Sequence, residues 1–101
     1  MQLTERQKKF LRRAAHSLKP VVAASDKGIS PAVLGEIELA LDHHELIKIR
    51  LRMGDRDVRN AAVTGILDST GAILLSRVGN VATIYRANTD KPKIILPKAG
   101  N

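Results

Sequence analysis

The sequence predicts a single compact α/β domain with a four-stranded mixed sheet, in the element order α-β-α-β-α-β-β. Three observations support this: helical periodicity alternates with short apolar runs, two helical segments are flanked by strand candidates, and a two-residue turn separates the last two strands. The 101 residues suit one domain, and 44% hydrophobic residues suffice for a core. We expect the core over about residues 3–87 and an irregular C-terminal tail over 88–101, where the composition becomes polar and proline-containing.

The first helix is predicted to begin after Thr4. Thr4 can serve as the N-cap, and Gln7 stands three residues later, at the spacing of a capping box. One arc of this helix collects apolar side chains: Leu3, Phe10, Leu11, Ala14, Ala15 and Leu18. The opposite arc collects a basic ridge: Arg6, Lys8, Lys9, Arg12, Arg13, His16 and Lys19. We expect the apolar arc to pack and the ridge to face solvent, with Pro20 ending the helix.

A short buried strand and a second helix are expected next. The run from Val21 to Ala24 is apolar and β-branched at its start, and its length suits a strand. In the turn over residues 25–31, Ser30 can cap the second helix and Pro31 suits its first position. The apolar residues that follow have helical spacing: Val33, Leu34, Ile37, Ala40 and Leu41. We expect this helix to end at about His43 or His44.

The second half of the chain predicts a strand, a helix and a hairpin. From Leu46 the apolar period changes to two: Ile47, Ile49, Leu51 and Met53 alternate with Lys48, Arg50 and Arg52. That part of the sheet should therefore have one cationic face open to solvent. Asp55 or Asp57 can cap the third helix, which Gly71 should close and whose apolar positions are Val58, Ala61, Ala62, Val63 and Ile66. Apolar runs over 72–78 and 81–86, separated only by Gly79-Asn80, predict an antiparallel hairpin.

Positive charge is concentrated at the amino terminus. The chain has 17 Lys and Arg against 10 Asp and Glu, a net charge of +7, and residues 1–20 hold six bases and one acid. Such a patch attracts polyanions by Coulomb steering and counterion release, which indicates nucleic acid or anionic lipid as a partner. A merely solubilising surface is the alternative. Membrane binding by the first helix is disfavoured, because its apolar arc is rich in alanine and is needed by the core.

The residue inventory excludes several function classes. The absence of Cys excludes a disulfide framework, a Cys-ligated zinc and a thiol nucleophile. Charges interrupt the amino-terminal segment where a signal peptide needs an apolar run, and no stretch suits a membrane span, so we expect a cytoplasmic protein. Catalytic motifs are absent, and the adjacent His43 and His44 suit a helix end better than a metal site. We therefore expect no enzyme activity, no cofactor and no metal.

Phosphate contacts are better supported than base stacking. The aromatic residues are Phe10 and Tyr85, and Phe10 falls on the apolar arc, so a platform of exposed rings is not expected. The turn at Gly28 precedes the second helix, whose first backbone N–H groups lack helical partners and can face a phosphate. Lys27 adds a positive charge beside them. The alternative is that Gly28 serves only the turn.

Several stretches of the chain form a recognisable set: Gln7 through Leu18-Lys19-Pro20-Val21-Val22, the turn ending in Gly28, residues 36–41, Gly79, Tyr85-Arg86 and, as the most specific, His43-His44-Glu45-Leu46-Ile47-Lys48-Ile49. In these stretches the sequence resembles the CRM domain family (chloroplast RNA splicing and ribosome maturation) over residues 3–87, and its length is that of the stand-alone bacterial YhbY-like members. The resemblance implies a fold similar to the C-terminal domain of translation initiation factor three. It also implies RNA binding and association with precursors of the large ribosomal subunit.

One turn departs from the family pattern. Family members usually carry a G-x-x-G turn, similar to the loop that clamps nucleic-acid backbone in KH domains, whereas this chain has Ser25-Asp26-Lys27-Gly28. Serine restricts φ where glycine would not, and an acid inside the turn repels phosphate. Either the turn binds RNA less tightly than in relatives, or the basic ridge carries more of the affinity.

We therefore expect a non-catalytic, monomeric RNA-binding protein that docks on structured ribosomal RNA of the large-subunit precursor and assists assembly. The expected RNA contacts are Arg6, Lys9, Arg12, Arg13, Lys27 and Gly28, followed by Lys48, Arg50 and Arg52. The three strand residues could instead form a solvated sheet face. The alternative function is a module that binds a ribosomal protein or assembly factor through the same basic surface.

Overall fold

The computed structural model describes residues 2–25 and 28–98, and the elements within them follow the predicted order. The helices are α1 (Glu5–Ala15), α2 (Pro31–His44) and α3 (Arg56–Thr70). The strands are β1 (Val22–Ala24), β2 (Leu46–Leu51), β3 (Ile73–Val78) and β4 (Val81–Tyr85). The predicted α/β domain with a four-stranded mixed sheet is confirmed.

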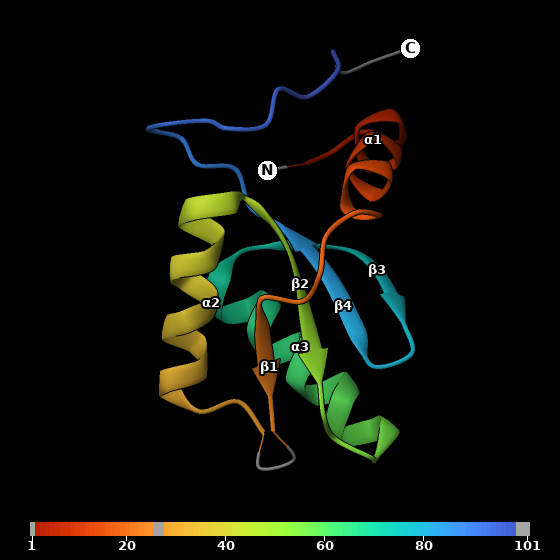
Figure 1. Ribbon diagram of the computed structural model, residues 1–101, viewed down its shortest axis with the longest axis vertical. Helices are drawn as coiled ribbons and strands as arrows, with labels where there is room; N and C mark the ends of the chain where they lie inside the picture. Colours follow the sequence, from red (N-terminus) through yellow and green to blue (C-terminus); the bar gives the residue numbers. More distant parts are fainter. Residues whose placement is uncertain (1, 26–27, 99–101) are drawn as a thin grey trace.

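The sheet has the strand order β1-β2-β4-β3 (Figure 1). β1 lies parallel to β2, whereas β4 lies antiparallel to both β2 and β3. The β3–β4 hairpin turns at Gly79 and Asn80, so that Val78 pairs with Val81, as the two-residue turn predicts. The hairpin thus places β4 between β2 and β3, and this makes the sheet mixed.

Two hydrophobic clusters cover the two faces of the sheet unequally. On one face, Ile47, Ile49 and Leu51 of β2 are at most 1% exposed and cluster with buried residues of α2 and α3. On the other face, α1 contributes only Leu11 and Ala15, which pack against buried residues at one end of the sheet. Figure 1 shows α1 at that end of the molecule. The remainder of this second face carries no helix, and we call it the open face.

Helix α1 begins as predicted but ends earlier. Thr4 and Gln7 form the capping box, with the Gln7 backbone N–H donating to Thr4 Oγ1 at 3.1 Å and the Thr4 N–H donating to Gln7 Oε1 at 3.0 Å. The prediction that Pro20 ends this helix was wrong, because the last helical residue is Ala15 and residues 16–21 form the connection to β1. The Val21 N–H donates to the Lys48 carbonyl at 3.0 Å. The chain therefore leaves the helix early enough to reach the edge of β2.

The predicted apolar arcs of the helices were too wide. Phe10 of α1 is 41% exposed, and Ala14 and Leu18 are also exposed, so the buried face of α1 is the narrow one at Leu11 and Ala15. In α3, Val58 is 43% exposed and Ala61 is exposed, whereas Ala62, Val63 and Ile66 are buried. Helical geometry puts Val58 about 80° and Ala61 about 140° around the axis from Ile66, which turns both away from the sheet.

The segment over residues 86–98 contains no helix or strand and is held by Glu45. The buried Glu45 carboxylate accepts the backbone N–H groups of Asn88 at 2.6 Å, Lys93 at 2.8 Å and Ile94 at 2.7 Å. Burial favours a higher pKa for Glu45, but these N–H donors and the Lys93 ammonium outweigh it and hold the pKa below its ordinary value. Glu45 has a φ of +64°, a conformation that side chains rarely adopt. Its bonds to the tail offset that strain.

Arg86 joins the same end of the sheet to two helices. One terminal nitrogen donates to both carboxylate oxygens of Glu38 at 2.9 Å and to the Thr70 carbonyl at 2.9 Å. The other donates to Asp42 Oδ1 at 2.9 Å. This guanidinium therefore fixes β4 against α2 and α3, and its charge is compensated within the fold.

Candidate nucleic-acid interface

The cationic face of β2 lies on the open face of the sheet. Lys48 and Arg50 are half-buried along their stems and alternate with the core residues of the strand. Across the sheet, Lys48 pairs with Thr83, and Thr83 in turn pairs with Ser76. The open face therefore combines two cations with two hydroxyl groups. Among the described residues, no carboxylate lies within 4.0 Å of either cation.

A groove runs between this open face and the end of α1. Its volume is about 460 Å³. The sheet contributes Lys48, Arg50, Ser76, Val78, Val81 and Thr83 to the lining of the groove. Helix α1 and the loop that connects it to β1 contribute Arg12, Ala15, His16, Leu18, Lys19 and Pro20. The walls thus carry five basic side chains, counting His16, around an apolar floor. Such a lining can hold phosphates by charge, and the half-buried Ser76 hydroxyl can donate a hydrogen bond to them, whereas Thr83 is only 3% exposed.

Sequence reasoning missed several residues of this groove as contacts. His16 and Lys19 belong to the predicted ridge but were not expected among the RNA contacts, and Ser76 and Thr83 were not expected at all. The sequence of β4 could have predicted that Thr83 lies on the open face, because its neighbours Ala82 and Ile84 are core residues and successive side chains of a strand point to opposite faces. The face on which Ser76 lies could not be predicted in the same way, because the β-bulge between Leu74 and Ser76 interrupts the alternation of β3.

The basic ridge of α1 divides into two parts. Arg12 turns toward the groove, where its Nε donates to the Leu75 carbonyl at 2.9 Å. Lys8 lies 3.6 Å from the Glu5 carboxylate, which partly compensates its charge. The second part of the ridge borders a separate hollow of about 340 Å³, lined by Arg6, Lys9, Phe10, Arg13 and Pro97. The structure therefore does not bring Arg6, Lys9 and Arg13 together with Arg12.

The exposed ring of Phe10 gives the second hollow a different chemistry. With 41% of its surface accessible and three cations beside it, this ring can stack on an unpaired base whose phosphates the cations attract. Tyr85, the other aromatic residue, is 1% exposed under α1. Its burial raises the pKa of the phenol, and the Glu45 charge raises it further. Phe10 is therefore the one described aromatic ring open to a ligand.

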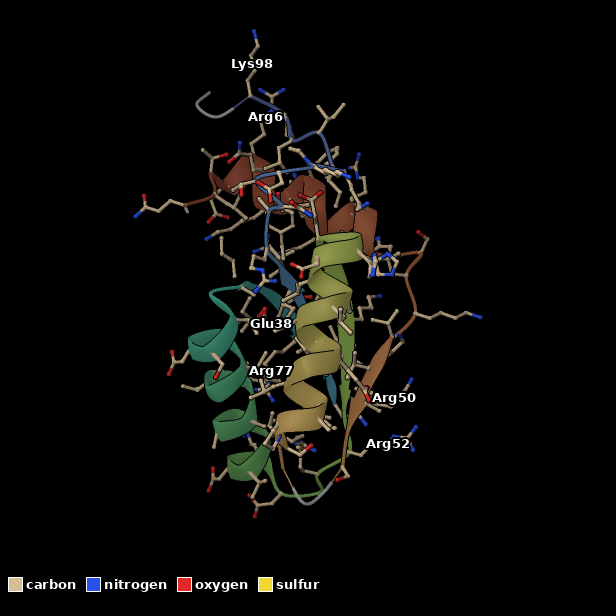
Figure 2. All side chains as sticks on the ribbon, turned by 90° about the vertical axis from the view of Figure 1, so that its left-hand side faces the viewer. Arg6, Glu38, Arg50, Arg52, Arg77 and Lys98 are labelled. Atoms are coloured by element: carbon tan, nitrogen blue, oxygen red, sulfur yellow. The ribbon has the colours of Figure 1, made fainter. Side chains whose placement is uncertain are left out.

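The turn before α2 lies far from α1. In Figure 1, α1 occupies the upper end, while β1 ends and α2 begins at the lower end, and the longest dimension of the molecule is 41 Å. Arg50 and Arg52 project from the side of the sheet between these ends (Figure 2). The Arg52 N–H donates to the Ala24 carbonyl at 2.8 Å, at the end of β1. Strand β2 and the residue that follows it thus place Lys48, Arg50 and Arg52 along the path from α1 to the turn.

Gly28 has the backbone that its position requires. Its φ of +91° favours glycine, and its N–H donates to the Ser25 carbonyl at 3.0 Å. At the start of α2, Ser30 Oγ accepts the Val33 N–H at 3.1 Å, so one of the donors expected to face a phosphate is already occupied. Lys27, the charged residue predicted beside Gly28, lies outside the described residues.

In the part of the chain that the structure describes, the histidine pair forms no metal site and the helices include no membrane span. His43 and His44 end α2 as predicted, and their ring centroids lie 6.3 Å apart. Over residues 2–25 and 28–98, no group of three or more His, Cys, Asp or Glu residues could hold a metal ion. In the same ranges, no helix combines the length and apolar character needed to cross a bilayer. The groove and the hollow beside Phe10 are cationic candidate surfaces, whereas a hollow of about 480 Å³ at Leu18, His44 and Leu46 is mainly apolar.

Comparison with known proteins identifies the class to which this fold and surface belong. The model of the CRS1/YhbY (CRM) domain family matches residues 3–86. The chain belongs to this family.

Individual relatives share most of their length with the chain. A Haemophilus influenzae protein named RNA-binding protein is 38% identical over 96 residues, which cover 95% of this chain and 96% of the relative. A Pseudomonas aeruginosa protein named a probable RNA-binding protein is 39% identical over 88 residues, 87% of this chain and 85% of the relative. The solution structure of a Staphylococcus aureus protein superposes with a TM-score of 0.79 at 28% identity, covering 95% of this chain and all of that protein. Its fold is the one described above.

Proposed function

We propose that this protein binds structured RNA, and that the groove between α1 and the open face is its principal RNA contact. The observation that carries the proposal is the position of Lys48 and Arg50, which face the basic end of α1 across the groove. Charges of one sign that face one another raise the local potential, and a phosphate backbone releases counterions when it binds there. The family relatives named RNA-binding proteins support the same conclusion.

The biological RNA that we propose is ribosomal RNA in precursors of the large subunit, where binding would assist assembly. This part of the proposal rests on the family resemblance. The protein would act in the cytoplasm, as a monomer and without catalysis, over a single domain that spans the chain. The RNA surface would comprise Arg6, Lys9, Arg12, Arg13, Lys27, Gly28, Lys48, Arg50 and Arg52, joined by His16 and Lys19.

A charge reversal in the groove tests the principal contact. Arg50→Glu should weaken binding to a structured ribosomal RNA fragment at least about tenfold, because it repels a phosphate and leaves the neighbouring Lys48 with a competing carboxylate. Lys91→Glu is the matched control: it changes the net charge equally at an exposed tail position outside the groove. Equal losses in the two variants, with unchanged circular dichroism and thermal melting, would contradict the groove as principal contact.

The salt dependence tests the role of phosphates. Affinity should fall steeply between about 50 mM and 200 mM salt, because each neutralised phosphate releases condensed counterions. A flat response would contradict a phosphate-driven interface.

The alternative, a module that binds a ribosomal protein or assembly factor through the same basic surface, predicts a different outcome with purified components. A stoichiometric complex with protein-free ribosomal RNA supports direct RNA binding. If such RNA is not bound while assembly intermediates are, the protein-binding alternative is the correct one. Crosslinking followed by sequencing of the bound RNA would then identify the site.

A further inference from the structure

Three arginines that the proposed RNA surface does not include gather on the other side of the sheet. Arg56 and Arg59 come from the start of α3, and Arg77 comes from β3. Together with Asn60 and Gly79 they border a hollow of about 270 Å³. Figure 2 shows Arg77 on the helix side of the sheet, opposite to the side from which Arg50 and Arg52 project. We call these three residues the arginine trio.

The charges of the trio are not compensated by carboxylates. Within the described residues, no Asp or Glu oxygen lies within 4.0 Å of a trio nitrogen. Asp55, which precedes Arg56, uses its carboxylate to cap α3, accepting the Val58 N–H at 3.1 Å. Asp57 follows in the first turn of the helix and makes no ion pair with the trio. Each guanidinium is a cation, so three positive charges surround this hollow.

Neutral acceptors hold two of the trio side chains in place. A terminal nitrogen of Arg59 donates to the Met53 carbonyl at 3.2 Å, and a terminal nitrogen of Arg77 donates to Asn60 Oδ1. The Nε atoms of both arginines are shielded from solvent and have no partner among the described residues. Buried donors of this kind are rare, and an unused charged donor is costly. Arg59 and Arg77 are thus oriented by neutral neighbours, and their positive charge remains uncompensated by a carboxylate among the described residues.

This arrangement matches an oxyanion with several acceptor oxygens. The guanidinium fork pairs with phosphate through parallel N–H donors, and its weak hydration lowers the cost of removing water. The trio lacks an aromatic or apolar floor, so the geometry suits a phosphate group better than a base.

The position of the trio relative to the groove indicates where that phosphate comes from. Ser76 and Val78 of β3 border the groove, whereas Arg77 and Gly79 border the trio hollow. The two sites therefore lie on opposite faces of the edge strand β3, and Val78, which borders the groove and is 76% exposed, stands in the chain between Arg77 and Gly79. An RNA strand that leaves the groove around the β3–β4 hairpin reaches the trio next.

We propose that Arg56, Arg59 and Arg77 bind a backbone phosphate of the same RNA that occupies the groove. This inference rests on the proposed function. It extends the RNA path around the edge of the sheet and requires an RNA long enough to cover both sites.

The first test uses RNA length and a double variant. Arg56→Gln with Arg77→Gln should weaken binding of a long structured RNA about tenfold and lower the salt slope by about one counterion, while the shortest RNA that binds the groove keeps its affinity. Glutamine retains a hydrogen-bond donor toward Asn60, which protects the fold. If the double variant nevertheless melts early, Arg56→Gln alone serves, because Arg56 is exposed. Unchanged affinity for the long RNA, or an equal loss at every length, would overturn the proposal.

The second test observes the arginines directly. In ¹⁵N spectra, the Nε–H signals of Arg59 and Arg77 should shift when the long RNA is added, and more weakly with inorganic phosphate. Arg86 is the internal control, since Glu38, Asp42 and the Thr70 carbonyl already occupy its guanidinium. A response to inorganic phosphate without a response to RNA, or equal shifts at Arg86, would overturn an RNA phosphate site.

The two proposals fail in different ways. If Arg50→Glu abolishes RNA binding and the trio variant does not alter it, the trio inference is wrong and the proposed function stands. If the parent protein binds no RNA of any length, the proposed function fails and the trio inference fails with it.

Discussion

The surroundings of the start of strand β2 and the open face of the same strand differ in how their charged side chains are paired. Next to its start, the buried Glu45 carboxylate and the Arg86 guanidinium are saturated by partners within the fold: three backbone N–H groups for the first, and two carboxylates and a carbonyl for the second. Along the open face, Lys48 and Arg50 have no carboxylate within 4.0 Å among the described residues. Charges that are compensated stabilise the fold, whereas charges left uncompensated are available to a polyanion.

Removing the Glu45 side chain should give the largest effect. Glu45→Ala leaves three backbone N–H groups of the tail without their acceptor, so the free energy of unfolding should fall by about 3 kcal/mol. The affinity of the folded fraction for RNA should change much less, because the groove does not contain Glu45. Urea unfolding and RNA titration check the two parts. A loss of affinity at unchanged stability would contradict this separation of roles.

Acid should weaken the same anchor by a smaller amount. Because the pKa of Glu45 is lowered by folding, its carboxylate contributes stability above its ordinary pKa of 4.5, and this contribution is lost as the pH falls through the lower folded value. Protonation keeps the side chain in place, so its effect should be smaller than that of truncation. Glu45→Gln should flatten the decline of stability in this acidic range, as measured by urea unfolding at several pH values. If stability declines with falling pH in Glu45→Gln as it does in the parent protein, acidic residues other than Glu45 cause the decline.

The exposed Phe10 ring should contribute to the binding of RNA that has unpaired bases. Phe10→Ala should weaken binding of an RNA with unpaired bases by about 1.5 kcal/mol and of a continuous duplex by much less, because only an unpaired base can stack on the ring. Phe10→Tyr keeps the aromatic face and is the matched control. Stability should change little, since the ring is 41% exposed. Equal losses for both RNAs would contradict a stacking role.

The smallest effect is expected at the turn that departs from the family pattern. Ser25→Gly with Asp26→Lys restores the first glycine and replaces an acid by a base, and should tighten RNA binding by about 1 kcal/mol. Gly28→Asp should weaken binding, but its φ of +91° also strains any side chain, so thermal melting must accompany the measurement. If neither change alters the affinity of a folded protein, this turn is only a turn, and the groove and the Phe10 hollow form the RNA surface.

The local elements of the fold could be predicted from the sequence because their signals are local. The capping box at Thr4, the N-caps at Ser30 and Asp55 and the left-handed Gly71 depend on residues at most four positions away. The alternation along β2 likewise predicted its two faces, since a strand turns successive side chains to opposite sides.

The site was predicted only where it coincides with such a pattern. Lys48 and Arg50 could be found from alternation, but the width of the buried face of α1 could not, because it depends on how much of the helix the sheet end covers. Phe10 was expected in the core for this reason. The arginine trio had no signal at all, since the remainder of α3 and most of β3 separate Arg77 from Arg56 and Arg59 along the chain.

By itself, the sequence determined the element order, the helix caps, the hairpin and the cationic face of β2, because each follows from residues that are neighbours in the chain. Only the tertiary structure decided that α1 covers one end of the sheet, that Glu45 holds the tail, and that Arg12 faces Arg50 across a groove. These contacts join residues tens of positions apart. Their free energy comes from burial and pairing between elements, which no local periodicity records.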